Sequence, residues 1–142
     1  MWVATVAGLM ADNYKIVDPE AVPETPFPDS GVTHTKLTGE LRAQEMRINQ
    51  VTVDPGETVA YHNHARQEEI YVCHDGPGEV YVDGEHYEVP EGGVVRVGCG
   101  VPRQVLNTGE EPTVWIMLGA PPIGSTEDFG EYELAEDGYD TE

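Results

Sequence analysis

The segment GETVAYHNHARQEEIYVCHDG, which runs from Gly56 to Gly76, decides the fold of this chain. Two histidines, His62 and His64, stand one residue apart in a stretch that otherwise has the alternating pattern of β-strands, and Glu68 and Glu69 follow after a short loop. Side chains at positions i and i+2 of a strand project from the same face, about 7 Å apart along the chain. We therefore expect the two imidazoles to point in the same direction.

This arrangement is a candidate metal site. Two imidazoles from one strand can share a metal ion at about 2.0–2.1 Å, and a carboxylate from the neighbouring strand would complete a set of three ligands. A pair of histidines at this spacing is more often incidental, so the pair alone does not decide the question. Alternation groups Glu69 with Tyr71 and Cys73, and Glu68 with Ile70 and Val72, and a purely hydrophobic interpretation would turn the second group inward.

Short apolar runs separated by turns continue along the chain and predict an all-β fold. A pair such as Asp83-Gly84 between two such runs is a strong hairpin signal. Short, evenly spaced strands without a long helical pattern indicate an antiparallel sandwich or barrel, whose interior can hold a pocket. The strands are expected at residues 33–40, 45–53, 57–64, 68–75, 78–84, 85–89, 93–97, 103–108 and 113–120.

The charge of the chain limits its partners. It has 27 acidic and 7 basic residues, for a formal net charge of −20. Such a surface repels nucleic acid and anionic membranes, so we expect neither as a partner. About 1 M salt shortens the Debye length to about 3 Å and so screens the repulsion between acidic side chains. An acidic surface with few lysines is therefore typical of proteins from salt-loving microbes. The alternative is an ordinary acidic protein with a solvated tail.

The 142 residues fit a single domain. We expect an extended arm over residues 1–30, of which 1–9 follow a misplaced translation start, a barrel over 31–121, and a solvated acidic tail over 122–142. Phe129 or Tyr132 of that tail could pack on the barrel wall. Cys73 and Cys99 are predicted to be free thiols in a reducing cytoplasm, and no segment directs export.

Two stretches together resemble the conserved motifs of the cupin superfamily, in its small, single-domain microbial or archaeal form. The similarity covers residues 17–121. In the second stretch, GGVVRVGCGVPRQVLN over 92–107, Gly98 stands where the family usually has proline and Arg103 where it has its last histidine ligand. The positions that match are Gly56, His62, His64, Glu69 and Gly76 in the first motif and Gly92, Gly100 and Asn107 in the second.

The resemblance implies a double-stranded β-helix, or jelly-roll barrel, and selects Glu69 over Glu68 as the carboxylate. Cupins usually hold Fe, Mn, Ni, Zn or Cu with three histidines and one glutamate. Arginine has no lone pair to offer, so three ligands remain, which are His62, His64 and Glu69. Either one divalent transition metal ion stays and Arg103 orients an anionic substrate, or the metal is lost and Arg103 pairs with Glu69 inside the barrel.

The resulting hypothesis is a small metal-dependent enzyme of the oxygenase or isomerase type that acts on a small anionic metabolite. Arg103 would be the catalytic and substrate-binding residue, with Tyr71 beside it in the pocket. The alternative is a non-catalytic module that binds a small molecule or anion without metal. Because Ile70 and Val72 would face outward and need cover, and because small cupins are commonly homodimers, we expect a homodimer.

Overall fold

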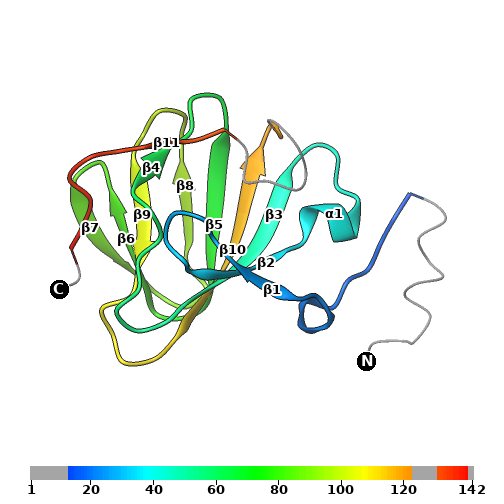
Figure 1. The fold of residues 1–142 in the computed structure, drawn as a ribbon, viewed down its shortest axis with the longest axis horizontal. Helices are drawn as coiled ribbons and strands as arrows, with labels where there is room; N and C mark the ends of the chain where they lie inside the picture. The colour runs from blue at the N-terminus through cyan, green and yellow to red at the C-terminus, as the bar shows by residue number, and fades with distance from the viewer. Residues whose placement is uncertain (1–12, 123–130, 141–142) are drawn as a thin grey trace.

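Short strands joined by turns make up nearly all of the molecule, as the spacing of its glycines and prolines indicates. The computed structural model describes residues 13–122 and 131–140 (Figure 1). Two short helical segments also occur in this part of the chain, a 3₁₀ turn at Pro19–Ala21 and the helix α1 at Thr38–Leu41. The strands are β1 (Glu24–Pro26), β2 (Thr33–Lys36), β3 (Arg47–Val53), β4 (His62–Asn63), β5 (Glu68–Asp75), β6 (Gly78–Val82), β7 (Glu85–Val89), β8 (Val94–Val97), β9 (Arg103–Leu106), β10 (Thr113–Ala120) and β11 (Glu133–Leu134).

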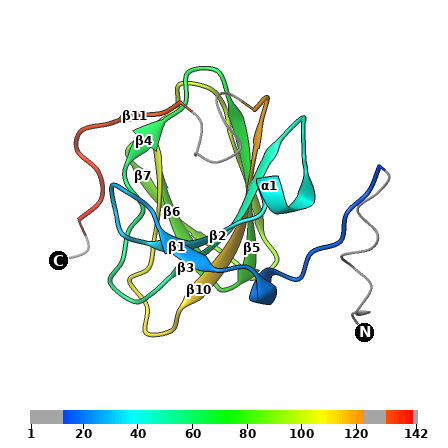
Figure 2. The same cartoon turned by 45° about the vertical axis from the view of Figure 1, so that its right-hand side comes forward.

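The strands form two antiparallel sheets that curve around a shared interior (Figure 2). One sheet has the order β1-β2-β3-β10-β5-β8, and the other has the order β11-β4-β9-β6-β7. Several neighbours in the sheets are far apart in sequence, as when β10 lies between β3 and β5. The predicted all-β jelly-roll barrel is confirmed, and its two sheets give the interior two walls from which side chains can converge.

The core lies at one end of this interior and is built mainly from valines. Trp115 on β10 is fully buried among them, with Cys73 and Val51 on the neighbouring strands. A Cβ atom added at Gly78 would lie 2.3 Å from the Trp115 ring, so the indole requires glycine there. Both Cys73 and Cys99 are free thiols, as predicted.

The inward face of the larger sheet becomes polar toward its other end. Alternation along β5 turns Glu69, Tyr71 and Cys73 inward, and Tyr71 is only 2% exposed. The face of β5 that carries Glu69 therefore points inward, as the motif predicted. Hydrophobicity alone would have turned the opposite face, with Glu68, inward. In register across β3, β10 and β5 lie two rows of inward residues, Arg47-Gly119-Glu69 and Asn49-Met117-Tyr71.

Six expected strands are shorter than the sequence pattern indicated, two of them by four residues or more. The strand expected over 33–40 ends at Lys36, and α1 follows it. The reason is that the Thr38 side chain, instead of a strand backbone, forms the hydrogen bonds with Ile48. Its hydroxyl donates to the Ile48 carbonyl at 3.1 Å and accepts from the Ile48 amide at 2.9 Å. The strand expected over 57–64 is regular only at His62–Asn63. The residues that precede β4 are joined to β9 by isolated backbone hydrogen bonds. One of them is donated by the Val59 amide to the Val105 carbonyl at 2.8 Å.

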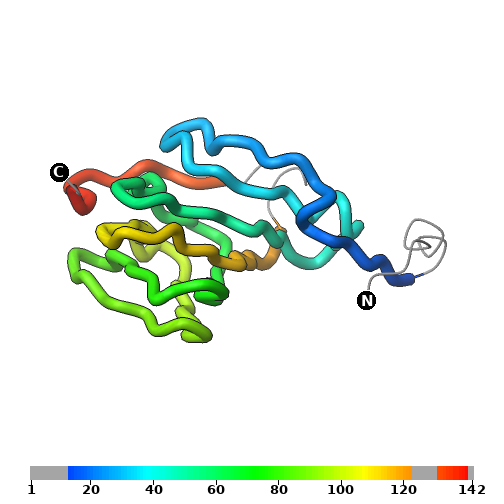
Figure 3. Tube along the Cα trace, turned by 90° about the horizontal axis from the view of Figure 1, so that it is seen from below, coloured from blue at the N-terminus to red at the C-terminus, as the bar shows by residue number. Residues whose placement is uncertain are grey.

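The acidic C-terminal segment differs from the solvated tail that its composition suggested. Residues 131–140 run across the barrel beside β4 (Figure 3), because β11 pairs with β4 and the Ala135 amide donates to the Tyr61 carbonyl at 2.8 Å. Phe129 and residues 1–9 lie outside the described residues. In the described part of the chain, none of the helices has the length and apolar character needed to cross a bilayer.

Candidate metal site and pocket

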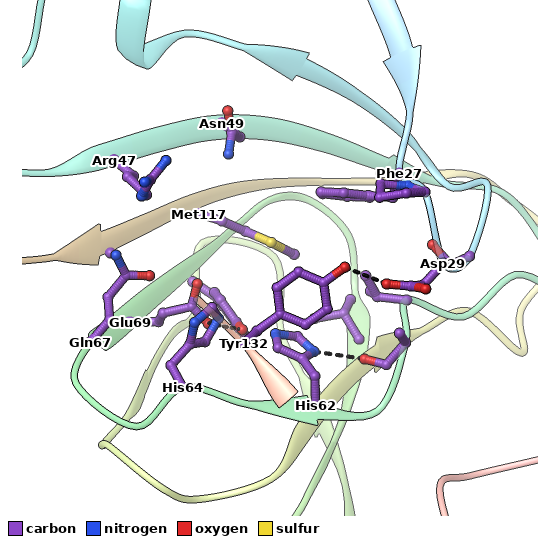
Figure 4. A pocket seen from close by; sticks show the side chains of 17 residues that line it. Phe27, Asp29, Arg47, Asn49, His62, His64, Gln67, Glu69, Met117 and Tyr132 are labelled. Atoms are coloured by element: carbon purple, nitrogen blue, oxygen red, sulfur yellow. Dashed lines mark hydrogen bonds and ion pairs between the residues drawn. The ribbon is translucent and has the colours of Figure 1, made fainter. Parts of the chain in front are cut away.

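The structure brings His62, His64 and Glu69 together inside the barrel (Figure 4). One ligand atom from each side chain lies within 4.8 Å of the others, and this is the group of potential ligands found among the described residues. The two histidines come from β4 and the residue just after it, and the glutamate comes from β5 in the opposing sheet. Glu68 is exposed and pairs with Arg96 at 2.9 Å instead.

Backbone carbonyls determine which nitrogen of each imidazole is available. His62 Nδ1 lies 2.7 Å from the Ala60 carbonyl oxygen, and His64 Nδ1 lies 2.7 Å from the Glu131 carbonyl oxygen. Because a carbonyl only accepts hydrogen bonds, both Nδ1 atoms carry the proton, and both Nε2 atoms keep a lone pair. Partners of this kind orient histidines that bind metals.

Burial keeps both imidazoles neutral near pH 7. It lowers the pKa of His64 to about 4, and the positive charges of Arg103 and Arg47 act in the same direction. Burial also lowers the pKa of His62. Neutral imidazole is the form that binds a metal ion, so neither histidine has to lose a proton first.

Glu69 is held by two donors on one of its oxygens. Its Oε1 accepts hydrogen bonds from the Tyr71 hydroxyl at 2.5 Å and from Arg103 Nη1 at 2.8 Å, and it lies 3.4 Å from His64 Nε2. Burial, followed by the charge of Glu69, raises the pKa of Tyr71, so the phenol remains a donor. Oε2 accepts no hydrogen bond from any described residue and is the oxygen open to another partner.

Arg103 lies on β9 directly opposite His62 and is fully buried. Besides its bond to Glu69, its Nη2 donates to the Gly98 carbonyl at 2.9 Å. This is the ion pair expected under the alternative in which the metal is lost and Arg103 pairs with Glu69. The side chain does not line the pocket, so its expected contact with a substrate stays a prediction, whereas Tyr71 does line the pocket.

The ligand cluster opens onto a pocket of about 80 Å³. Six polar residues of its lining were not predicted from the sequence as site residues: Asp29, Ser30, Arg47, Asn49, Gln67 and Tyr132. Alternation along β3 could have identified Arg47 and Asn49, which share the inward face with Val51 and Val53. No local pattern pointed to Gln67 in its loop, and Tyr132 in the acidic segment was expected only to pack on the barrel wall.

Tyr132 covers one side of this pocket. Its ring centroid lies 5.7 Å from that of His62 and 6.3 Å from that of His64. Its hydroxyl donates a short hydrogen bond to Asp29, which raises the pKa of Tyr132 to about 12. Glu131, the preceding residue, also forms an ion pair with Arg66. The segment from the far end of the chain therefore forms part of the site.

The other histidines, together with Trp115 and Met117, are not among the three candidate ligands. His34 is buried against Phe27, with ring centroids 4.1 Å apart, and burial lowers its pKa to about 4. His74 is exposed, and His86 pairs with Glu79 at 2.9 Å on the surface. Trp115 belongs to the core and Met117 packs against that core, as expected, and Met117 also lines the pocket.

Comparison with known proteins identifies relatives of this fold. A family model described as a cupin domain matches residues 49–119, half of the chain. An uncharacterized protein of Methanocaldococcus jannaschii is 29% identical over 75 residues, which are 53% of this chain and 60% of that protein. The match therefore spans less than two thirds of that relative's length.

Solved structures with different descriptions share the fold. A sugar phosphate isomerase of the cupin superfamily from Silicibacter pomeroyi is 18% identical, with a TM-score of 0.65 over 74% of each chain. A predicted oxalate decarboxylase from Thermotoga maritima is 18% identical, with a TM-score of 0.67 over 75% of this chain and 98% of that one. A polyketide cyclase from Streptomyces resistomycificus is 21% identical, with a TM-score of 0.65 over 75% of this chain and 78% of that one. At these identities the likeness shows the fold alone.

Proposed function

Because this chain belongs to the cupin family, we propose that it is a metal-dependent enzyme, of the oxygenase or isomerase type, that acts on a small anionic metabolite. The observation that carries the proposal is the cluster of His62, His64 and Glu69, whose potential ligand atoms lie within 4.8 Å of one another beside a pocket. The relatives named above differ in their described activities, so the fold does not select the reaction.

The residues present suit one divalent ion of iron, manganese, nickel or zinc. Two neutral imidazoles and a carboxylate are a donor set that these metals accept, with positions left for water or substrate. Both Nε2 lone pairs and Oε2 of Glu69 are available for this role. When bound, such an ion supplies Lewis-acid or redox chemistry to an oxygen of the substrate.

The chain's own residues prepare the site. Arg103 and Tyr71 orient Glu69 through hydrogen bonds to its Oε1, which lies 3.4 Å from His64 Nε2. We propose that Tyr71 also contacts the substrate, because it lines the pocket, and that Arg103 takes part in catalysis and in orienting the substrate through its hold on Glu69.

A second candidate function is a binding module without metal. The observation in its favour is the ion pair between Arg103 and Glu69, 2.8 Å long, because the guanidinium already neutralises the carboxylate and repels a dication. In that case the pocket would bind a small molecule or anion without reaction.

Elemental analysis of protein purified without a histidine tag separates the two functions. The enzyme proposal predicts close to one equivalent of transition metal, and less than about a tenth of an equivalent would favour the binding module. Replacing His64 with alanine should abolish metal retention. The matched control is the same change at the exposed His74, which should retain the ion.

We also propose that the protein is a cytoplasmic homodimer from a salt-loving organism. Ile70 and Val72 lie half-buried on the outer face of the larger sheet, beside Leu118 and Ile116 on β10. A second copy packed on this face would cover them. Light scattering should give a dimer, and Ile116→Lys should give a folded monomer. A wild-type monomer at micromolar concentration would contradict this assembly.

A further inference from the structure

We propose that Arg47 binds the carboxylate of a small organic acid and thereby orients this substrate toward His62, His64 and Glu69. The inference rests on the proposed function, and it names the substrate class and a recognition residue for the same site. It replaces no role given to Arg103, which is buried behind Glu69 and does not line the pocket.

The fold places Arg47 on the same row as the metal-binding carboxylate. Arg47 pairs with Gly119, and Gly119 pairs with Glu69, so their backbones lie two strand spacings, about 10 Å, apart. A Cβ atom at position 119 would lie 2.7 Å from Gln67 Oε1. The absence of a side chain at Gly119 therefore lets the Gln67 amide enter the space over this row.

The cationic side chain of the pocket lies at one end. Arg47, Asn49 and Gln67 lie on the same side as His64 and Glu69, whereas Phe27 and Asp29 lie at the far end (Figure 4). The Asp29 carboxylate there already accepts a hydrogen bond from Tyr132. An anionic ligand that fits this distribution has its charged group near Arg47 and the metal ligands, and the rest of the ligand extends toward the other end.

The charge at the Arg47 end favours an anion. Arg47 is 4% exposed, and among the described lining residues it is the only cationic side chain. Its positive charge extends to His64, whose pKa it helps to lower. Because a guanidinium stays protonated and presents a planar pair of donors, it matches a carboxylate with two parallel hydrogen bonds.

The size of the pocket selects among anions. A volume of about 80 Å³, at roughly 10–15 Å³ for each water-sized group, holds roughly five to eight non-hydrogen atoms. Short carboxylic acids such as pyruvate are of this size. A sugar phosphate is about twice as large, and the Tyr132 ring, with its bond to Asp29, lies on one side of the pocket.

Calorimetric titration of tag-free protein tests the inference, with pyruvate as the probe, pyruvamide as its neutral analogue and inorganic phosphate as a second anion. Each titration is run on zinc-loaded and on metal-free protein, and metal content is measured separately. Arg47→Met should weaken pyruvate binding ten- to a hundredfold and leave zinc content unchanged. The control Arg96→Met, at an exposed surface pair, should change neither.

The outcomes separate the two proposals. Pyruvate binding that depends on Arg47 supports the inference even if the protein retains no zinc, in which case the metal-dependent function alone fails. Zinc retention with pyruvate binding unchanged within about threefold in Arg47→Met overturns the inference alone. The inference is also overturned if wild-type protein binds no pyruvate, whether zinc-loaded or metal-free. The same holds if wild-type protein binds pyruvamide or phosphate more tightly than pyruvate. If Arg47→Met does not fold, Asn49→Ala is titrated instead and should weaken binding severalfold.

Discussion

Removal of the C-terminal segment that begins at Glu131 should weaken metal binding, although it contains none of the three ligands. The Glu131 carbonyl accepts the hydrogen bond of His64 Nδ1 at 2.7 Å, and the Tyr132 ring packs against both histidines. A chain that stops after Gly130 lacks both contacts. His64 can then turn, and its Nδ1 proton is no longer held in place.

The size of the effect follows from this one hydrogen bond. Loss of the partner that orients a histidine ligand typically lowers metal affinity about 10- to 100-fold, which corresponds to about 1.4–2.7 kcal/mol. Competition with a chelator of known affinity measures this for zinc, and the visible spectrum of bound cobalt reports the coordination geometry. Both readouts should change in the chain that stops after Gly130.

The matched control stops after Ala135, because it keeps the Glu131 carbonyl, Tyr132 and the bond from the Ala135 amide to Tyr61. It should bind zinc like the full-length chain. If the two truncated chains, both folded by circular dichroism, bind zinc within about threefold of each other, the segment does not orient His64 and the reasoning is refuted.

Three further results are expected. Arg103→Met leaves Glu69 without its cation, so the free energy of unfolding in urea should fall by about 3 kcal/mol, against less than about 1 kcal/mol for the surface Arg96→Met; equal losses would contradict the buried pair. Burial lowers the pKa of His34 to about 4, below its value near 6.5 in the unfolded chain. The unfolded chain therefore binds more protons between these pH values, and stability should fall as the pH drops from 6.5 to 4; His34→Gln should flatten that slope by up to about 1.4 kcal/mol per pH unit. Raising KCl from about 0.1 M to about 1 M should increase the melting temperature, because it screens the repulsion within a chain of net charge −20, and an unchanged melting temperature would argue against a halophilic protein.

Local patterns predicted the strands that are longest and most regular. The bounds expected at 68–75 and 113–120 are those of β5 and β10, each of which contains an unbroken run of apolar residues between turns. The helix α1 was missed because its residues carry no helical periodicity, and it forms only when the Thr38 side chain meets Ile48 on β3. The same limit applies to β11, whose acidic sequence becomes a strand by pairing with β4.

Sequence by itself determined that His62 and His64 share a face, because the two-residue period of a strand is a local property of the chain, and the resemblance to the cupin motif selected Glu69 over Glu68 as the third candidate ligand. Tertiary structure decided what surrounds them. His64 receives its orienting carbonyl from 67 residues away, and the guanidinium that holds Glu69 lies 34 residues away. Contacts over such separations depend on how the two sheets pack and register against each other, and no local pattern carries that information.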